Sequence, residues 1–248
     1  MNLLNQIVSN QRLARWDIRA IDVALFICLV LGFAYVSSGT LNQAYVSFSG
    51  SELDSESLWF LIVSGFGLQL GCILAWVAFQ VFVPNENRNL PDSFGRSAVW
   101  GCVGFAATYL AILPIMLVWR SGLDALDFEY ELQLPVQLVQ NGGSPLEMLM
   151  MSLLVVVGAP IGEELVYRGF FYRFLHRRIS DVYAIGLTSA LFAIMHFNLY
   201  SFMPLFALGI GLCLVYRITG NLISCIVMHA CFNGVNFAFM MFSSPVEL

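Results

Sequence analysis

The chain has 248 residues, of which 59% are hydrophobic and only 11% are charged. A soluble globular domain carries about 25% charged residues, so this composition excludes an ordinary soluble protein and indicates an integral membrane protein. The net charge of −5 is spread over several short polar segments, and no basic run indicates a nucleic-acid partner. We therefore expect membrane lipids around the chain and no bound nucleic acid.

Seven apolar stretches predict membrane-spanning helices, since a span needs about 20 predominantly apolar residues. The sequence therefore predicts an all-α, polytopic transmembrane helical bundle. The first stretch is too long for the apolar region of a signal peptide and contains Asp22, so we expect an uncleaved anchor. The fifth and sixth stretches are short and join near Asn198. The predicted spans are 18–36, 58–83, 97–119, 145–172, 182–197, 200–217 and 221–243.

The arginines predict how the chain is oriented in the membrane. With seven spans, nine of the 11 basic residues fall on one side, Arg120 lies alone on the other, and Arg168 lies within a span. Because loops rich in positive charge stay in the cytoplasm, the N-terminus is predicted inside and the C-terminus outside. The expected location is the cell membrane.

The fourth predicted span begins at a clear helix signal. Ser144 is a good N-cap, Pro145 suits the first helical position, and Glu147 completes a capping box. Pro160 then interrupts the helix interior, where it removes one backbone hydrogen bond and bends the chain. Irregular backbone at membrane depth is tolerated where it packs in protein or lines a wet cavity.

Two adjacent carboxylates, Glu163 and Glu164, lie one turn beyond that proline. A charged side chain at the bilayer centre costs about 2.5 to 3.5 kcal/mol on insertion scales, so this pair indicates a functional site. Glu164 stands four residues before Arg168, the favourable order for a helical ion pair. Glu163 points about 100° away from that pair around the helix axis. A carboxylate that is not a member of the ion pair suits a general base. A purely structural Glu–Arg pair, with Glu163 in a buried polar network, is the alternative.

Two histidines follow on later predicted spans. His196 lies about 16 residues after the turn that follows the fourth span, and Glu163 lies about 16 before it, so an antiparallel hairpin places both at one level. His229 and Asn233 are four residues apart and share one helix face. The residues expected near the middle of the bilayer are Glu163, Glu164, His196, His229 and Asn233.

The order of these residues resembles that of a known family. Three motifs, Glu-Glu-x-x-x-Arg, Phe-x-x-x-His and His-x-x-x-Asn, occur in sequence on three apolar segments, as in the CAAX protease and bacteriocin-processing (CPBP, or Abi) intramembrane peptidases. The resemblance covers roughly residues 144–240. The motif residues here are Glu163, Glu164, Arg168, Phe192, His196, His229 and Asn233.

The resemblance implies an endopeptidase that hydrolyses a peptide bond of a lipid-anchored or transmembrane protein or peptide. In such a site Glu163 and His196 would hold and activate the attacking water. His229 and Asn233 would stabilise the oxyanion of the tetrahedral intermediate. The resemblance also divides the chain into spans without a recognised motif (1–143) and a catalytic helical core (144–248), within one integral domain.

The supporting parts of the implied site are an ion pair and, in one version, a metal. Glu164 would be held by Arg168. Zinc bound by Glu163, His196 and His229 is chemically reasonable. A Glu–His pair that activates water without metal is equally reasonable, and we favour it.

Two other classes of function stay open. Buried Glu and His also build proton relays, so a proton-coupled transporter is one alternative, although we find no internal repeat to support it. A non-catalytic membrane binding or immunity protein, which would keep the same polar residues for packing, is the other.

Overall fold

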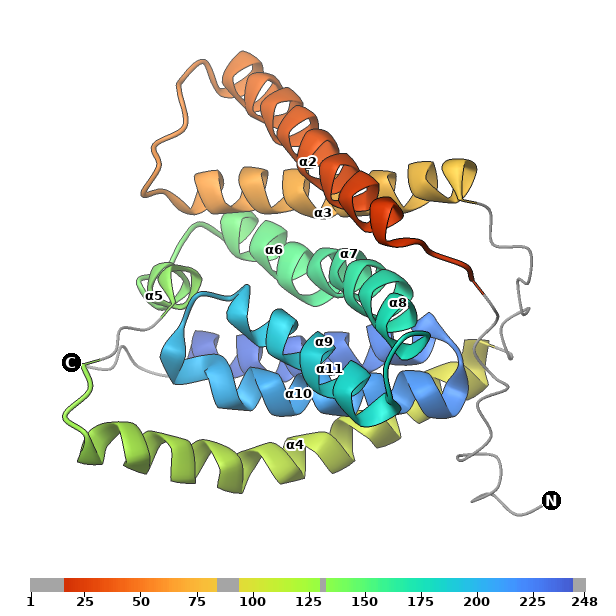
Figure 1. The fold of residues 1–248 in the computed structure, drawn as a ribbon. Helices are drawn as coiled ribbons and strands as arrows, with labels where there is room; N and C mark the ends of the chain where they lie inside the picture. The colour runs from red at the N-terminus through yellow and green to blue at the C-terminus, as the bar shows by residue number, and fades with distance from the viewer. Residues whose placement is uncertain (1–15, 84–93, 130–132, 243–248) are drawn as a thin grey trace. The chain divides into compact units, whose positions relative to one another are not determined.

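The computed structural model describes residues 16–83, 94–129 and 133–242, and the regular elements in these ranges are all helices (Figure 1). The predicted all-α class is therefore confirmed. Six helices are long and apolar enough to cross a membrane, judged by length and composition. These six are Ala20–Ser49, Leu58–Phe82, Phe94–Ala125, Pro145–His176, Leu199–Thr219 and Leu222–Met241.

The fifth predicted span differs from the other six. It corresponds to α9 (Asp181–Ile194), which has 14 residues and is shorter than the roughly 20 residues that cross a bilayer. The number of seven spans therefore stays a prediction, and so does the orientation that depends on it. A short helix that the sequence did not indicate, α5 (Leu134–Gln140), precedes the fourth span.

The chain divides into two compact units, each built from separate stretches of sequence. The histidine unit, named for His196 and His229, falls within Met1–Asp17, Asn85–Leu132 and Tyr167–Phe232. The glutamate unit, named for Glu163 and Glu164, falls within Ile18–Pro84, Gln133–Val166 and Asn233–Leu248.

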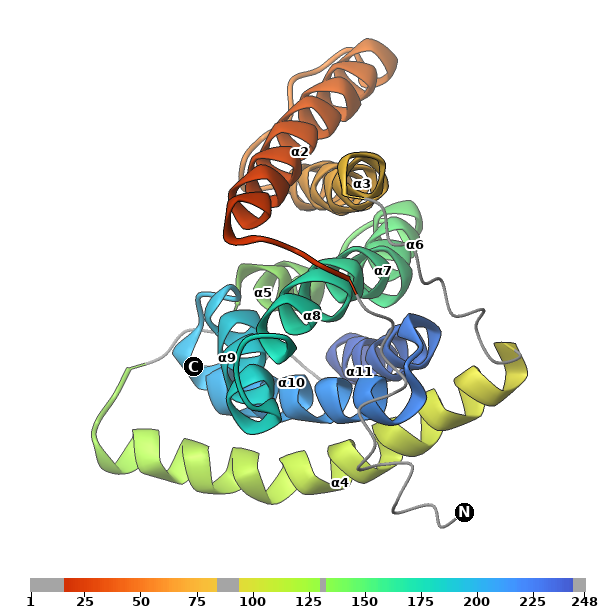
Figure 2. The same ribbon diagram turned by 45° about the vertical axis from the view of Figure 1, so that its right-hand side comes forward.

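In the glutamate unit two long helices, α2 and α3, lie side by side in both views (Figures 1 and 2). The other side of α3 contacts the segments that lead to the two glutamates. Buried Leu58, Ile62, Met151, Leu154 and Phe237 form the core of this unit. Its helical elements are α2 (Ala20–Ser49), α3 (Leu58–Phe82), α5, α6 (Pro145–Leu153), η1 (Leu154–Gly158) and α7 (Ala159–Glu164).

In the histidine unit α10 packs against both α4 and α9 (Figure 2). The connection between α9 and α10 is tight because Asn198 caps α10, its Oδ1 accepting a hydrogen bond from the Ser201 N–H at 2.9 Å. The elements of this unit are α4 (Phe94–Ala125), η2 (Leu165–Tyr172) from Tyr167 onward, α8 (Arg173–His176), α9, α10 (Leu199–Thr219) and α11 (Leu222–Phe242) as far as Phe232.

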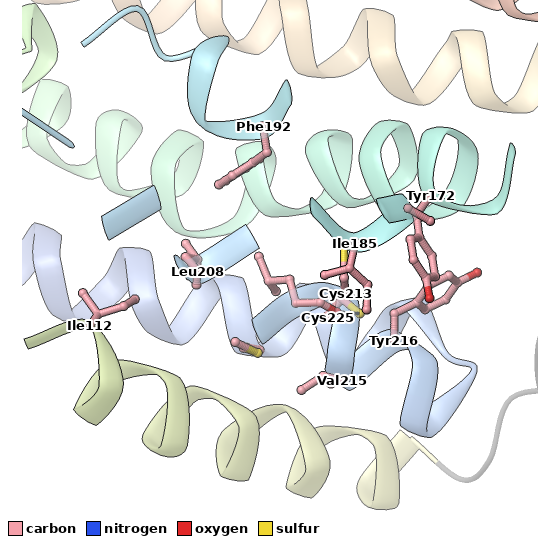
Figure 3. Packing of buried hydrophobic residues seen from close by; sticks show 12 residues of the cluster. Ile112, Tyr172, Ile185, Phe192, Leu208, Cys213, Val215, Tyr216 and Cys225 are labelled. Carbon is pink, nitrogen blue, oxygen red and sulfur yellow. Dashed lines mark hydrogen bonds between the residues drawn. The ribbon is translucent and has the colours of Figure 1, made fainter. Parts of the chain in front are cut away.

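The core of the histidine unit is a cluster of apolar and aromatic side chains (Figure 3). Tyr172 and Tyr216 meet edge to face, with ring centroids 6.0 Å apart. Phe192 of α9 and Leu208 of α10 are also members. Phe192 is fully buried. The packing of this core therefore fixes the position of the Phe192 ring and of the side chains that contact it.

Candidate active site

The helix that carries the two glutamates changes its hydrogen-bond register along its length. It begins as the sequence predicted: Ser144 Oγ accepts a hydrogen bond from the Glu147 N–H, and Glu147 Oε2 accepts one from the Ser144 N–H at 2.8 Å. The helix is then π-helical in η1, α-helical in α7, and π-helical again in η2. Short π-helical turns inside α-helices are rare, and those that occur are often found at functional sites.

Pro160 explains why the register changes before the glutamates. The Ala159 N–H donates to the carbonyl of Leu154, five residues back, and not to Val155. The residue five positions beyond Val155 is Pro160, which has no N–H to donate. The carbonyl of Val155 is thus without a backbone donor in either helical register, and the interruption predicted at Pro160 takes the form of a π-helical turn.

Asn233 supplies the missing donor. Its Nδ2 donates to the carbonyl oxygen of Val155 at 2.8 Å. Asn233 lies on α11, in the part of that helix that belongs to the glutamate unit. The amide group carries two N–H bonds, so one remains for another acceptor. The predicted contribution of Asn233 to an oxyanion site stays a prediction.

The two glutamates end α7 and differ in exposure. Glu164 is fully buried, whereas Glu163 is half-buried. The preceding residue, Gly162, leaves room for Gln69 of α3, because a Cβ atom at that position would collide with the Gln69 Oε1. Gln69 is 7% exposed, and sequence analysis missed it, although an amide in the middle of the apolar run of α3 was a signal available to be read.

His196 lies in the turn that follows α9, because the helix ends at Ile194. The Nδ1 of His196 is 2.8 Å from the carbonyl oxygen of Phe192. A carbonyl can only accept, so in the neutral imidazole Nδ1 carries the proton and Nε2 is the nitrogen that accepts one. The next residue, Phe197, has a φ of 49°. Such left-handed backbone is uncommon for a bulky residue and tends to occur at active sites.

The ring of Phe192 gathers the polar candidates of the histidine unit. The His196 ring centroid lies 4.9 Å from that of Phe192, and the His229 centroid lies 5.6 Å from it. The guanidinium carbon of Arg168 stands 4.9 Å from the same ring centroid, a distance at which a cation is attracted by the face of a ring. His229 itself is 2% exposed. Four predicted residues therefore meet at one buried ring: Phe192 itself, Arg168, His196 and His229.

Arg168 is held in that cluster by a second contact. Its side chain is fully buried, and its Nη2 donates to the carbonyl of Gly209 on α10 at 3.2 Å. Gly209 is needed here because a Cβ atom would lie 2.8 Å from the Cβ of Ser189 on α9. The close approach of α9 and α10 and the position of the guanidinium group thus depend on the same glycine.

The seven candidate residues are divided between the two units. In the histidine unit the structure brings four of them together, and in the glutamate unit the two carboxylates are consecutive. That both sets form one active site stays a prediction, and so does the Glu164–Arg168 ion pair. The glutamate unit holds Glu163, Glu164 and Asn233, and the histidine unit holds Arg168, Phe192, His196 and His229.

The side chains predicted to bind zinc come from both units. Within the described parts of the chain, no three His, Cys, Asp or Glu side chains lie close enough together to hold a metal ion. A zinc site needs at least three such protein ligands. Because Glu163 lies in one unit and His196 and His229 lie in the other, a zinc site formed by these three residues stays a prediction, and we propose no step through a metal.

Part of the chain matches a known protein family. Residues 145–235 match the family described as Type II CAAX prenyl endopeptidase Rce1-like. This segment is less than half of the 248 residues, and it includes all seven candidate residues. The resemblance to the CAAX protease family is thereby confirmed. No curated protein and no solved structure matches the chain. Together with the six apolar helices, the match indicates an integral membrane protein and supports a protease of the CAAX type.

Proposed function

We propose that this chain, whose residues 145–235 are similar to type II CAAX prenyl endopeptidases, hydrolyses a peptide bond of a membrane-associated protein or peptide. The family match supports the class of reaction. The observation that carries the assignment of residues is the buried cluster in which Arg168, His196 and His229 contact the ring of Phe192.

In the proposed reaction Glu163 and His196 act on one water molecule. The water donates a hydrogen bond to Nε2 of His196, the nitrogen that the contact of Nδ1 with the Phe192 carbonyl leaves unprotonated. Glu163 accepts the other proton of the water as the oxygen bonds to the carbonyl carbon of the substrate. The tetrahedral intermediate then collapses: the carbon–nitrogen bond breaks, and Glu163 returns the proton to the leaving nitrogen. General acid–base catalysis of this kind contributes roughly 10²- to 10⁴-fold.

The negative charge that develops on the substrate oxygen needs a donor that is already in place. We propose that an N–H of His229 is this donor, because the imidazole is buried and its ring is fixed against Phe192. The remaining N–H of Asn233, one helical turn further along α11, adds a second donor. In this proposal Arg168 pairs with Glu164 and keeps the carboxylate beside the general base in place.

The proposed substrate is a lipid-anchored or transmembrane peptide, since Glu163, His229 and Asn233 lie in helices that are long and apolar enough to cross a bilayer. A prenylated C-terminus is the first probe to use, because the matching family is described as prenyl endopeptidases. An acylated or unmodified transmembrane peptide is the second.

The test measures cleavage by the full chain in lipid nanodiscs. The probe is a farnesylated peptide with a fluorophore and a quencher on either side of the bond after the modified cysteine. An acylated and an unmodified transmembrane peptide are run beside it, with products identified by mass spectrometry. We expect Glu163→Gln to lower kcat at least about 100-fold without changing the melting temperature. Glu147→Gln, at the capping box of the same helix, is the matched control and should keep the wild-type kcat.

Two results would overturn the proposal. If the wild-type chain cleaves none of the three peptides and Glu163→Gln loses its fold, the glutamate has a structural role, as in a non-catalytic membrane protein. If Glu163→Gln cleaves as fast as the wild type, the general base lies elsewhere.

A further inference from the structure

The hydrogen bond from the Asn233 side chain to the Val155 carbonyl stabilises an interruption in the helix backbone. A carbonyl that loses its donor in an apolar surrounding is costly, and a proline inside a membrane helix is tolerated when a neighbouring side chain bonds the freed backbone group. Here the freed carbonyl is that of Val155, since Ala159 bonds to Leu154 and Pro160 has no N–H. The side chain that bonds it, at 2.8 Å, is Asn233.

The place of this bond along the helix connects it with the proposed chemistry. Val155 lies in η1, and η1 leads directly into α7, which ends at Glu163 and Glu164. The geometry of the π-helical turn therefore sets the direction in which α7 leaves it. A side chain that fixes the Val155 carbonyl also fixes where the glutamates stand.

We propose that Asn233 is a positioning residue: its amide replaces the hydrogen bond that Pro160 removes from the helix, and so holds α7 and its glutamates in place. This inference rests on the proposed function for the role of Glu163, but not for the bond itself. It assigns Asn233 a role that is separate from donating to the oxyanion, because the two roles use different N–H groups and predict different dependence on Pro160.

The test is a double-mutant cycle between Asn233→Ala and Pro160→Ala. An alanine at position 160 restores a backbone N–H, so the helix can bond the Val155 carbonyl by itself. We expect Asn233→Ala alone to lower the melting temperature by roughly 3 to 10 °C and kcat by about 10- to 100-fold. In the Pro160→Ala background the loss of melting temperature should be much smaller, and kcat should keep only the part of its loss that comes from the missing oxyanion donor. Asn221→Ala is the matched control, because its Nδ2 donates to Ser97 at 2.8 Å, and its effect should be equal in both backgrounds.

Hydrogen exchange of the backbone amides of α7 is measured on the same four proteins. Asn233→Ala should speed exchange at these amides, and Pro160→Ala should suppress that increase. Where Pro160→Ala by itself abolishes cleavage, exchange takes the place of kcat. Exchange reports on local opening of α7, which a general loss of stability would not raise selectively.

The proposal would be overturned if Asn233→Ala caused equal losses in both backgrounds. The losses compared are those in melting temperature and in kcat, or in amide exchange where it replaces kcat. An oxyanion donor without a positioning role gives that result for kcat, because restoring the N–H at position 160 does not replace it. Melting and exchange need no substrate. A chain that cleaves nothing but shows the expected coupling therefore contradicts the proposed function alone.

Discussion

The candidate residues of the histidine unit and those of the glutamate unit are held in different ways. In the histidine unit Arg168, His196 and His229 are placed by contact with one buried ring, that of Phe192. In the glutamate unit the irregular backbone around Pro160 determines where Glu163 and Glu164 lie along the helix.

This difference predicts how each set of candidate residues responds to substitution. When a ring that contacts several polar groups is removed, all of those contacts are lost together, because they share one side chain. A helix held by a cap, a glycine contact and a side-chain hydrogen bond loses less stability with each substitution, since each interaction contributes separately. The substitutions that follow test this contrast in order of expected effect.

Removing the ring of Phe192 should have the largest effect on stability. Phe192→Ala leaves a cavity under two imidazoles and a guanidinium group, and buried Phe→Ala changes cost about 3 to 5 kcal/mol of unfolding free energy. Phe206→Ala is the control, because Phe206 is half-buried and stacks on Phe202 with centroids 6.1 Å apart. Unfolding in detergent measures both. An equal loss for the two variants would mean that the Phe192 ring is ordinary core.

Filling the contact between Gly162 and Gln69 should have an intermediate effect. Gly162→Ala places a methyl group against the Gln69 Oε1, and overpacking of this kind costs about 1 to 3 kcal/mol. Adding Gln69→Ala should recover most of the loss, since it removes the colliding atom. Gly186→Ala on α9 is the control, because a Cβ atom there meets nothing within 4 Å. If Gln69→Ala gives no recovery, the two helices do not approach as described.

Removing the cap of the glutamate helix should have the smallest effect. Ser144→Ala deletes the acceptor of the Glu147 N–H, which costs about 0.5 to 2 kcal/mol. Ser152→Ala is the control, since its hydroxyl only donates to the Leu149 carbonyl within the same helix. Thermal melting compares the two. A Ser144→Ala loss above that of Phe192→Ala would reverse the contrast between the two units.

Local signals were enough to predict parts of this structure. The N-terminus of the fourth span followed from Ser144, Pro145 and Glu147, because a capping box is written within four residues and needs no distant partner. Pro160 showed that the helix is interrupted, since proline lacks a donor in any context. The three motifs were found because each occupies a few positions on one helix.

Features that depend on distant partners were not predictable. Sequence alone did not show that the helix would resolve Pro160 by a π-helical turn, because that depends on a donor from Asn233 about 70 residues later. The end of α9 at Ile194, two residues before His196, follows from the left-handed backbone at Phe197, which is not a residue type that favours it. The contact between Gly162 and Gln69 also joins segments far apart in the chain.

The most direct test of the central claim is a kinetic double-mutant cycle between Glu163→Gln and His196→Ala on cleavage of the probe peptide. Two residues that act on one water should behave as a unit, as catalytic groups with a shared role do. Each single substitution should then lower kcat by about 10²- to 10⁴-fold, and the double substitution should lower it little further. Losses that multiply in the double variant would show that the carboxylate and the imidazole act independently, and would contradict the account.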